Sequence, residues 1–536
     1  MARYLNPGKE AFSEQARDEL YVDKTPLLAV LNSFITKPRL KYVCVSRPRR
    51  FGKTVTAQML CAYYGKGARA SSLFKSLQIA TAPDYKTHLN RYHVIFISMA
   101  AEYSGSDNSV ARLKERLTSG IGRQLKEAFP DAILPEHELL WEMFEDVHAY
   151  LMQHKKARER FVFVIDEWDC VMRSSRDKAD EIVAYLDFIR DLFKDREYVA
   201  LAYMTGILPI KKYGNHSALN MFDEYSITSP EPFAPYLGFT ENEVNSFCET
   251  YVLSFEEMRR WYDGYTVGKA EHIFNPSSVC KAISVKEYGS YWTRTETWEA
   301  LAAYLKLNHQ GLKDEIVKLL AGDTVRVDVS TFENDMTTFK SRDDVLTLLT
   351  HLGYLSAEPD NFGDPDFRIL RIPNREIRSE FRRVISRNED YASTAAAIEH
   401  SRELLQALLE GDNVKVAAGV AKAHEEHASI LRYNDENSFS CVLSLAFYSA
   451  RDRYTLIREL PTGKGFADLV FIPKPGADAP ALLIELKYDH SVESALTQIK
   501  SQHYPQALEA YRGNLILAGI SYDKDSKEHS CVIERA

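Results

Sequence analysis

The stretch VSRPRRFGKT, residues 45–54, joins the end of an apolar run to a basic loop and a Gly-Lys-Thr triplet. Gly52, Lys53 and Thr54 form the ending of a phosphate-binding P-loop, although the general pattern has a glycine where this chain has Arg47. KYVCV (41–45) predicts a strand before the loop, and TVTAQMLCAYY (54–64) has apolar residues at helical spacing after it. Strand, loop and helix are the arrangement that the motif requires. The alternative is a basic turn that contains the triplet by chance.

A P-loop holds phosphates through its backbone N–H groups and the N-terminus of the following helix. In that case Lys53 contacts the β- and γ-phosphates, and Thr54 holds magnesium.

Two later apolar runs end in polar residues and fit the same interpretation. FVFVIDEWD (161–169) predicts a central strand of a buried parallel sheet, and α/β sheets place their ligands at such carboxyl ends. There Asp166 would contact the magnesium shell and Glu167 would orient the attacking water. YVALAYMTGIL (198–208) predicts a third strand, whose Thr205 is a candidate sensor of the γ-phosphate. Each run alone is also compatible with plain core, but their order and spacing favour a nucleotide-binding domain.

Ordered motifs along almost the full length resemble the bacterial AAA-ATPase-like family. They are YVDKT (21–25), SRPRRFGKT (46–54), VIDEWD (164–169), MTGILPI (204–210), LGFTENEV (237–244), WYDGY (261–265), FNPSSV (274–279), YW (291–292) and IPN (372–374). RPRRFGK is the usual loop of that family, so the resemblance implies a nucleotide site that includes Arg49 and Arg50. Members usually carry a PD-(D/E)XK nuclease-superfamily domain at the C-terminus.

The middle of the chain predicts helices followed by a hairpin. Apolar spacing over 237–267 and 297–320 indicates packed helices, and residues 343–352 predict another. The extended runs 354–357 and 367–372 then flank the turn-rich PDNFGDPD. Helix and hairpin resemble a winged helix, which often binds DNA; a lid packed against the nucleotide-binding domain is an equal alternative. Five arginines follow, either as a solvated helix face or as a contact to a phosphate backbone or a neighbouring nucleotide: Arg375, Arg378, Arg382, Arg383 and Arg387.

The C-terminal third begins after a polar break at NEDYAS (388–393). Two helical stretches are followed by strands, one helix and two further strands, which is the restriction-endonuclease-like order. The expected elements are strands over 454–460, 465–472 and 481–488, a helix over 491–508, and strands over 514–522 and 529–535.

The candidate chemistry of this third lies on the predicted strands 465–472 and 481–488. Asp468 stands among apolar neighbours, where an unpaired carboxylate is costly to bury. Glu485 and Lys487 are two residues apart, so they point to the same face of their strand. Two carboxylates and a lysine are the set that metal-assisted phosphodiester hydrolysis needs, and Glu459 is a further candidate ligand. The alternative is a salt bridge between Lys487 and Asp468 on a half-buried sheet.

The resemblance also implies that Gln498 and Tyr504 on the following helix correspond to helix residues of exonuclease-like members. One observation disfavours a nuclease: residues 451–536 contain eleven Lys or Arg and twelve Asp or Glu, whereas duplex binding usually leaves a basic footprint.

Composition fits a globular protein of several domains. The chain has 536 residues, 45% of them hydrophobic and 27% charged, and a net charge of -9. No apolar run approaches the roughly 20 residues of a membrane helix, and MARYLNPGKEAF is not expected to be a signal peptide. Seven scattered cysteines without a CxxC pair argue against a zinc site or disulfide framework and for a reducing compartment.

The predicted fold class is α/β. It comprises a P-loop AAA-ATPase-like domain with a parallel sheet (1–235), a helical lid and winged-helix-like domain (236–388), and a PD-(D/E)XK nuclease-like α/β domain (389–536). We hypothesise a cytoplasmic protein that binds and hydrolyses ATP and thereby regulates a nuclease, with Mg²⁺ or Mn²⁺ as its metal. Nucleic acid, DNA or RNA, is the expected partner, together with a homo-oligomer and no membrane. Defence against mobile DNA is an analogy. The competing hypothesis is a non-catalytic nucleotide switch or scaffold whose nuclease fold only binds nucleic acid or protein.

Overall fold

The chain divides into two compact units. In the computed structural model, one consists of Met1–Thr293 with Arg326–Ile377, and the other of Arg294–Val325 with Arg378–Ala536. This division does not test the finer three-domain scheme, which stays a prediction. The residues described are 3–536 without 136, 155–158, 175–177, 211–218, 293–300, 302–303, 306–310, 333–338, 340, 428–441, 462–465, 475–476, 478, 489–491, 493, 496, 498–507, 509–510, 512 and 524–525.

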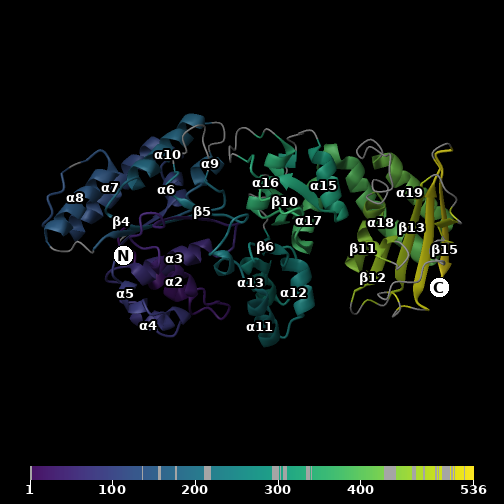
Figure 1. The fold of residues 1–536 in the computed structure, drawn as a ribbon, viewed down its shortest axis with the longest axis horizontal. Coiled ribbons are helices and arrows are strands. Elements are labelled where there is room, and N and C mark those ends of the chain that lie inside the picture. The colour runs from purple at the N-terminus through teal and green to yellow at the C-terminus, as the bar shows by residue number, and fades with distance from the viewer. Residues whose placement is uncertain are drawn as a thin grey trace. The chain divides into compact units, whose positions relative to one another are not determined.

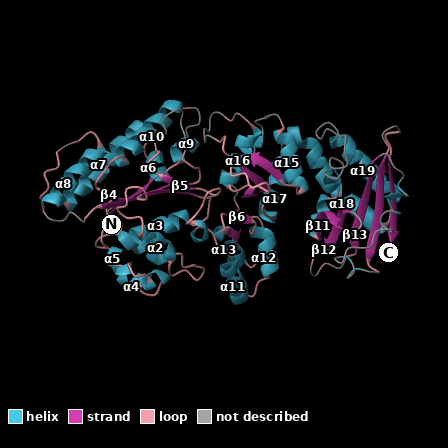
Figure 2. Ribbon diagram, in the orientation of Figure 1, coloured by secondary structure: helices cyan, strands magenta, loops and turns pink. Residues whose placement is uncertain are grey.

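The first unit is built on a parallel sheet, of which Figures 1 and 2 label β4 and β5. Its strand order is β2-β3-β4-β1-β5. Its three central strands are buried along their whole length, which explains their uninterrupted apolar sequences. β4 therefore separates β1, which leads into the P-loop, from β3, which ends at Asp166. The strands are β1 (Tyr42–Ser46), β2 (His93–Ser98), β3 (Phe161–Asp166), β4 (Val199–Gly206) and β5 (Asp223–Tyr225).

Two helical layers cover the opposite faces of this sheet (Figure 1). Val43 and Val45 pack with the first layer, whereas Tyr42 and Cys44 of the same strand pack with the second, as the alternation of a strand requires. The first layer contains α1 (Glu10–Gln15), α2 (Pro26–Asn32), α3 (Lys53–Tyr64), α4 (Ser71–Phe74) and α5 (Tyr85–His88). The second contains α6 (Met99–Ser104), α7 (Val110–Ala128), α8 (Leu140–Gln153), α9 (Cys170–Ser174) and α10 (Ala179–Phe193).

The rest of the first unit combines helices with two small sheets. The predicted helix and hairpin of the winged-helix-like segment are confirmed as α16, β9 and β10, and β10 lies between β8 and β9. The helical interpretation of 237–267 was wrong at its end, where a hairpin of β6 and β7 begins. The elements are α11 (Glu241–Tyr251), α12 (Phe255–Tyr262), β6 (Tyr265–Val267), β7 (Ala270–Ile273), α13 (Pro276–Val285), β8 (Val325–Asp328), α16 (Arg342–Leu352), β9 (Ser356–Pro359) and β10 (Phe367–Arg371).

The second unit contains a mixed sheet of order β11-β12-β13-β14-β15, in which only β13 and β14 pair in parallel among the described residues. All five predicted strands are confirmed within one or two residues. The predicted helix over 491–508 lies mostly outside the described residues. The elements are α15 (Leu312–Ala321), α17 (Arg375–Ile385), α18 (Ala392–Glu410), α19 (Asn413–His427), β11 (Tyr454–Pro461), β12 (Phe466–Pro473), β13 (Ala481–Tyr488), β14 (Leu515–Tyr522) and β15 (His529–Arg535).

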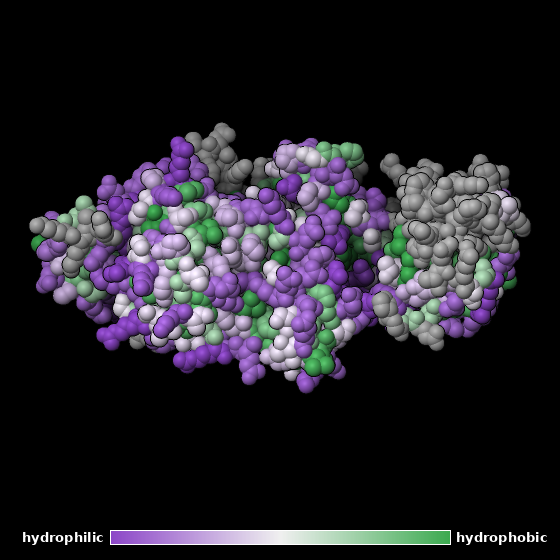
Figure 3. All heavy atoms as spheres, turned by 60° about the horizontal axis from the view of Figure 1, so that its bottom comes forward, coloured by the Kyte–Doolittle hydropathy of each residue, from purple (hydrophilic) through white to green (hydrophobic). Residues whose placement is uncertain are grey.

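The face of the molecule in Figure 3 is mainly hydrophilic, and its apolar residues appear in scattered groups. Among the described residues, none of the helices combines the length and the apolarity that crossing a membrane requires.

Candidate functional site

The P-loop connects β1 to α3 and ends at a lysine folded back on its own loop. Gly52 precedes the helix with a φ of 85°, and a Cβ added there would meet no atom within 4 Å. Lys53 is the first residue of α3, and its Nζ donates to the carbonyl oxygens of Arg47 (2.9 Å) and Pro48 (2.6 Å). Burial lowers the pKa of Lys53 to about 8, although Asp169 and Asp166 act in the opposite direction. The ammonium group therefore lies where an incoming phosphate would compete with two carbonyl groups.

Thr54 and Asp166 lie in contact although 112 positions separate them. The Thr54 hydroxyl donates to Oδ2 of Asp166 at 2.8 Å, and burial raises the pKa of that carboxyl group. Glu167 follows in the left-handed region, with a φ of 55°, and its N–H donates to Oδ1 of Asp166 (3.1 Å). The structure thus brings together the hydroxyl and the carboxylate that the sequence assigned to magnesium. Two adjacent oxygens of this kind suit a hard cation.

Thr205 lies directly beside Asp166 in the register of β3 and β4. Its side chain is fully buried, and its hydroxyl donates to the carbonyl of Val45 at 3.1 Å. The backbone N–H of Trp168 donates to the Thr205 carbonyl at 3.1 Å. The residue therefore ties the strand that precedes the P-loop to the turn after β3, and its role as a γ-phosphate sensor stays a prediction.

Asp169 is a buried anchor whose contacts the sequence does not reveal. Its side chain is fully buried, and Oδ2 accepts hydrogen bonds from the backbone N–H groups of Ile207 (3.2 Å) and Leu208 (3.0 Å). Arg173 on α9 donates its Nε to the same oxygen at 3.0 Å. These three bonds give Asp169 a structural role, because they fasten the loop after β3 to the end of β4.

Arg47, the departure from the general P-loop pattern, is fully buried. Its Nη1 donates to the carbonyls of Ser46 (2.8 Å) and Tyr225 (2.9 Å), so it bridges β1 and β5. Burial lowers its pKa to about 10. Among the described residues, Nε and Nη2 of Arg47 have no hydrogen-bond partner. A glycine could supply none of this bridging, which explains why the loop departs from the pattern without losing its shape.

Arg49 and Arg50, predicted to bind the nucleotide, also contact the helical region. Arg50 has a φ of 67°, and its Nη1 donates to the carbonyl of Tyr291 at 2.9 Å. The carbonyl of Arg49 accepts a long hydrogen bond, 3.5 Å, from the side chain of Asn275. Contact of either guanidinium group with a nucleotide stays a prediction.

In the second unit, β12 and β13 bring three of the predicted nuclease residues together. β12 and β13 are antiparallel and Leu469 pairs with Ile484, so Asp468, which precedes Leu469, and Glu485, which follows Ile484, lie on the same side of that pair. Oδ2 of Asp468 accepts the N–H of Leu486 at 2.7 Å, and Nζ of Lys487 lies 3.3 Å from Oε1 of Glu485. Burial, and then the Asp468 charge, raise the pKa of Glu485 to about 7.

An ion pair in this cluster joins Lys487 to Glu485, and the salt bridge between Lys487 and Asp468 that the alternative expects stays a prediction. The side chain of Glu459 lies outside the described residues, as do Gln498 and Tyr504. In the described part of the chain no group of three or more His, Cys, Asp or Glu could hold a metal. Among the described side chains of this cluster, the carboxyl groups of Asp468 and Glu485 are the candidate donors, and they suit Mg²⁺ because this ion usually keeps several waters.

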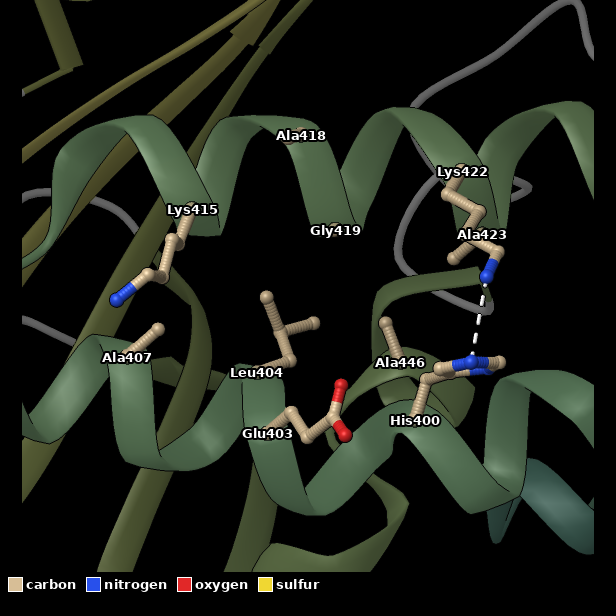
Figure 4. A pocket seen from close by; sticks show the side chains of 10 residues that line it. All are labelled: His400, Glu403, Leu404, Ala407, Lys415, Ala418, Gly419, Lys422, Ala423 and Ala446. Atoms are coloured by element: carbon tan, nitrogen blue, oxygen red, sulfur yellow. Dashed lines mark hydrogen bonds between the residues drawn. The ribbon is translucent and has the colours of Figure 1, made fainter.

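A separate cavity of about 300 Å³ lies between α18 and α19 (Figure 4). Leu404 and small side chains form its centre, and Lys415 and Lys422 lie toward its two ends. His400 accepts a hydrogen bond from Lys422 (3.2 Å) and lies 2.7 Å from the carbonyl of Ala396. None of the predicted site residues lines this cavity.

Two family models match the chain at the places where these sites lie. Residues 8–214 match the model AAA-ATPase_like, described as predicted AAA-ATPase, and residues 434–530 match PDDEXK_9, described as the PD-(D/E)XK nuclease superfamily. No curated protein matches the chain. Among solved structures, the Aeropyrum pernix ORC2 protein (ADPNP-ADP complexes) is 13% identical over 72% of this chain and 98% of that chain, with a TM-score of 0.30. The Aeropyrum pernix ORC1 protein in complex with DNA is 13% identical over 73% and 99%, with a TM-score of 0.25.

Proposed function

We propose that this chain, which carries an AAA-ATPase-like domain over residues 8–214 and a PD-(D/E)XK nuclease-superfamily domain over residues 434–530, is an ATP-regulated, metal-dependent nuclease. The observation that carries this proposal is the cluster of Asp468, Glu485 and Lys487 at one place on β12 and β13. A carboxyl group whose pKa is raised by burial and then by a neighbouring carboxylate, as that of Glu485 is, is costly to the fold, and such arrangements concentrate at functional sites.

In the nuclease site, Asp468 and Glu485 would hold Mg²⁺ or Mn²⁺, with Glu459 as a further ligand. The ion would supply charge stabilisation and an activated water for cleavage of a phosphodiester bond. Lys487 has an exposed fraction of only 15%, so its ammonium group is held beside Glu485 and can stabilise the charge that develops on the phosphate.

In the nucleotide site, Lys53 would leave the carbonyls of its own loop to contact the β- and γ-phosphates of ATP. Thr54 and Asp166, which are hydrogen-bonded to each other, would hold the accompanying Mg²⁺, and Glu167 would orient the attacking water. Arg49, Arg50 and Thr205 complete the proposed contacts. ATP binding or hydrolysis would then control cleavage.

Nucleic acid, DNA or RNA, is the proposed substrate, but the winged-helix-like hairpin is a poor candidate for its phosphate contacts. The turn between β9 and β10 carries Asp360, Asp364 and Asp366, and Asp360 is paired with Arg326. On α17, Arg383 is paired with Glu380 at 2.8 Å. Arg382 lies over the ring of Tyr448, 5.5 Å from its centroid, and both arginines are exposed. We therefore favour α17 over the hairpin as the nucleic-acid contact.

We also propose a cellular compartment, an oligomeric state and a biological role. The described cysteines are unpaired, which supports a reducing, cytoplasmic setting. A homo-oligomer and a role in defence against mobile DNA rest on analogy. Residues 451–536 contain eleven Lys or Arg and twelve Asp or Glu, so they lack the basic footprint of duplex binding. This favours a second candidate, a nucleotide switch whose nuclease fold only binds nucleic acid or protein.

The test is a cleavage assay on single- and double-stranded DNA and RNA, with Mg²⁺, Mn²⁺ or EDTA, for the wild type and Asp468→Asn. We expect metal-dependent cleavage by the wild type alone. Absence of cleavage from every combination would favour the switch, whereas equal cleavage by both proteins would show that the activity does not depend on Asp468.

A further inference from the structure

The crest of the P-loop, Pro48–Phe51, is packed against residues that lie beyond the segment matched by the AAA-ATPase-like model. Phe51 is fully buried, and its carbonyl accepts the N–H of Gly238 at 3.2 Å. Its ring meets that of Tyr265 edge to face, with centroids 5.3 Å apart and an angle of 89°. These partners belong to the same compact unit as the P-loop.

Gly353, the residue that ends α16, makes the closest approach to the crest. Its φ is +89°, and a Cβ built there would lie 2.7 Å from Cβ of Pro48 and 2.8 Å from the ring of Trp292. Tyr265 donates its hydroxyl to the Gly353 carbonyl at 2.7 Å, and its ring stacks on that of Trp292. Pro48 is therefore held against a turn that has no room for a side chain.

The same crest carries an acceptor of Lys53. When Lys53 turns toward phosphates, the Pro48 carbonyl loses its 2.6 Å hydrogen bond, so the shape of the crest and the position of the lysine depend on each other. Gly353 and Tyr265 pack on the crest, so they also affect whether Lys53 bonds to its own loop or turns toward phosphates.

We propose that Gly353 and Tyr265 are positioning residues of the nucleotide site: they hold the P-loop crest in the shape that receives phosphates. Nucleotide binding and the order of the α16–β9 turn are then coupled, and by linkage each stabilises the other to the same extent. The inference rests on the proposed function, because it requires that the P-loop binds a nucleotide. It places part of the ATP site outside residues 8–214.

The test compares Gly353→Ala with a matched control, Gly363→Ala. Both glycines have positive φ, +89° and +76°, so both substitutions carry backbone strain, but a Cβ at Gly363 meets no atom within 4 Å. Calorimetric titration of the full chain measures the affinity for ATP and for inorganic tripolyphosphate. The second ligand tests the phosphate contacts without the adenosine. We expect Gly353→Ala to weaken both ligands by about tenfold or more, because a forced contact of this kind displaces its neighbour. Gly363→Ala should bind like the wild type.

A second variant and amide hydrogen exchange distinguish a positioning role in the nucleotide site from a role in the stability of the fold alone. Tyr265→Phe removes only the hydroxyl that holds Gly353, and it serves as the test variant should Gly353→Ala not fold. Titrations run well below the melting temperature of each variant exclude a loss that merely reflects unfolding. In the wild type, ATP should slow amide hydrogen exchange in 349–357, and in either variant this protection should shrink.

Wild-type affinity in folded Gly353→Ala and Tyr265→Phe, or equal losses in Gly353→Ala and Gly363→Ala, would overturn the inference. Failure of the wild type itself to bind ATP would instead overturn the proposed function.

Discussion

Replacing Asp169 by Asn tests whether the loop after β3 is fastened to the end of β4 by one buried carboxylate. Asp169 is fully buried and accepts hydrogen bonds from Ile207, Leu208 and Arg173. Asn keeps the size and one acceptor oxygen but loses the charge that Arg173 pairs with. A hydrogen bond to a charged group contributes about 1.5–3 kcal/mol, so we expect the free energy of unfolding to fall by about 2–3 kcal/mol. Asp169→Ala leaves Arg173 without its carboxylate partner, so it should lower the free energy of unfolding by about 3–5 kcal/mol.

The assay is urea denaturation of the full chain followed by tryptophan fluorescence, because Trp168 is fully buried next to Asp169 in the sequence. Asp187→Asn is the matched control: it makes the same chemical change in an aspartate–arginine pair, with Arg190, whose side chains are 42% and 37% exposed. That pair should contribute about 0–1 kcal/mol. Equal, small effects of Asp169→Asn and Asp187→Asn would refute the anchor.

Three further predictions concern acid sensitivity, ATP turnover and the nuclease metal. Burial lowers the pKa of His351 to about 4, below the ordinary value of 6.5, so the contribution of this group to stability is fully present above pH 6.5 and is lost progressively as the pH falls from 6.5 to 4. Unfolding free energy should therefore drop by about 2 kcal/mol between pH 7 and pH 5 from this group alone, and His351→Phe should remove that part of the slope in parallel denaturation curves. Glu167→Gln should bind ATP normally while hydrolysing it slowly, since the amide does not polarise water as a carboxylate does; normal turnover would move this role to another residue. Asp468→Asn should abolish cleavage but leave the metal-free melting temperature unchanged or higher, because it removes repulsion with Glu485; a loss of about 1–3 kcal/mol would instead indicate a structural role.

Much of the fold could be predicted because its elements are encoded locally. The apolar runs of β1, β3 and β4 could be read directly, as could the two-residue spacing of Glu485 and Lys487. The sheet order could not be read in the same way, yet it decides that Thr205 lies between Asp166 and the P-loop strand. The hairpin of β6 and β7 was missed because its apolar residues continue the helical spacing before it.

The contacts that complete the sites could not be predicted from the sequence, because they join residues that are far apart along the chain. Gly353 predicts a helix end, and nothing in its neighbourhood indicates that Pro48 lies against it. Asp169 belongs to an acidic motif, but its partners Ile207 and Leu208 are apolar residues that bond only through their backbone. Arg47 could be recognised as a departure from the P-loop pattern, whereas its burial between β1 and β5 required the fold.

The measurement that tests the central claim most directly is the rate of nucleic-acid cleavage with and without ATP, compared between the wild type and Lys53→Ala. The backbone N–H groups of the loop alone cannot neutralise the β- and γ-phosphates, so this variant should lose ATP binding while its cluster of Asp468, Glu485 and Lys487 stays intact. We predict that ATP changes the cleavage rate of the wild type and leaves that of Lys53→Ala at its ATP-free value. An ATP effect of equal size in both proteins, or no ATP effect on an active wild type, would contradict regulation of the nuclease through this P-loop.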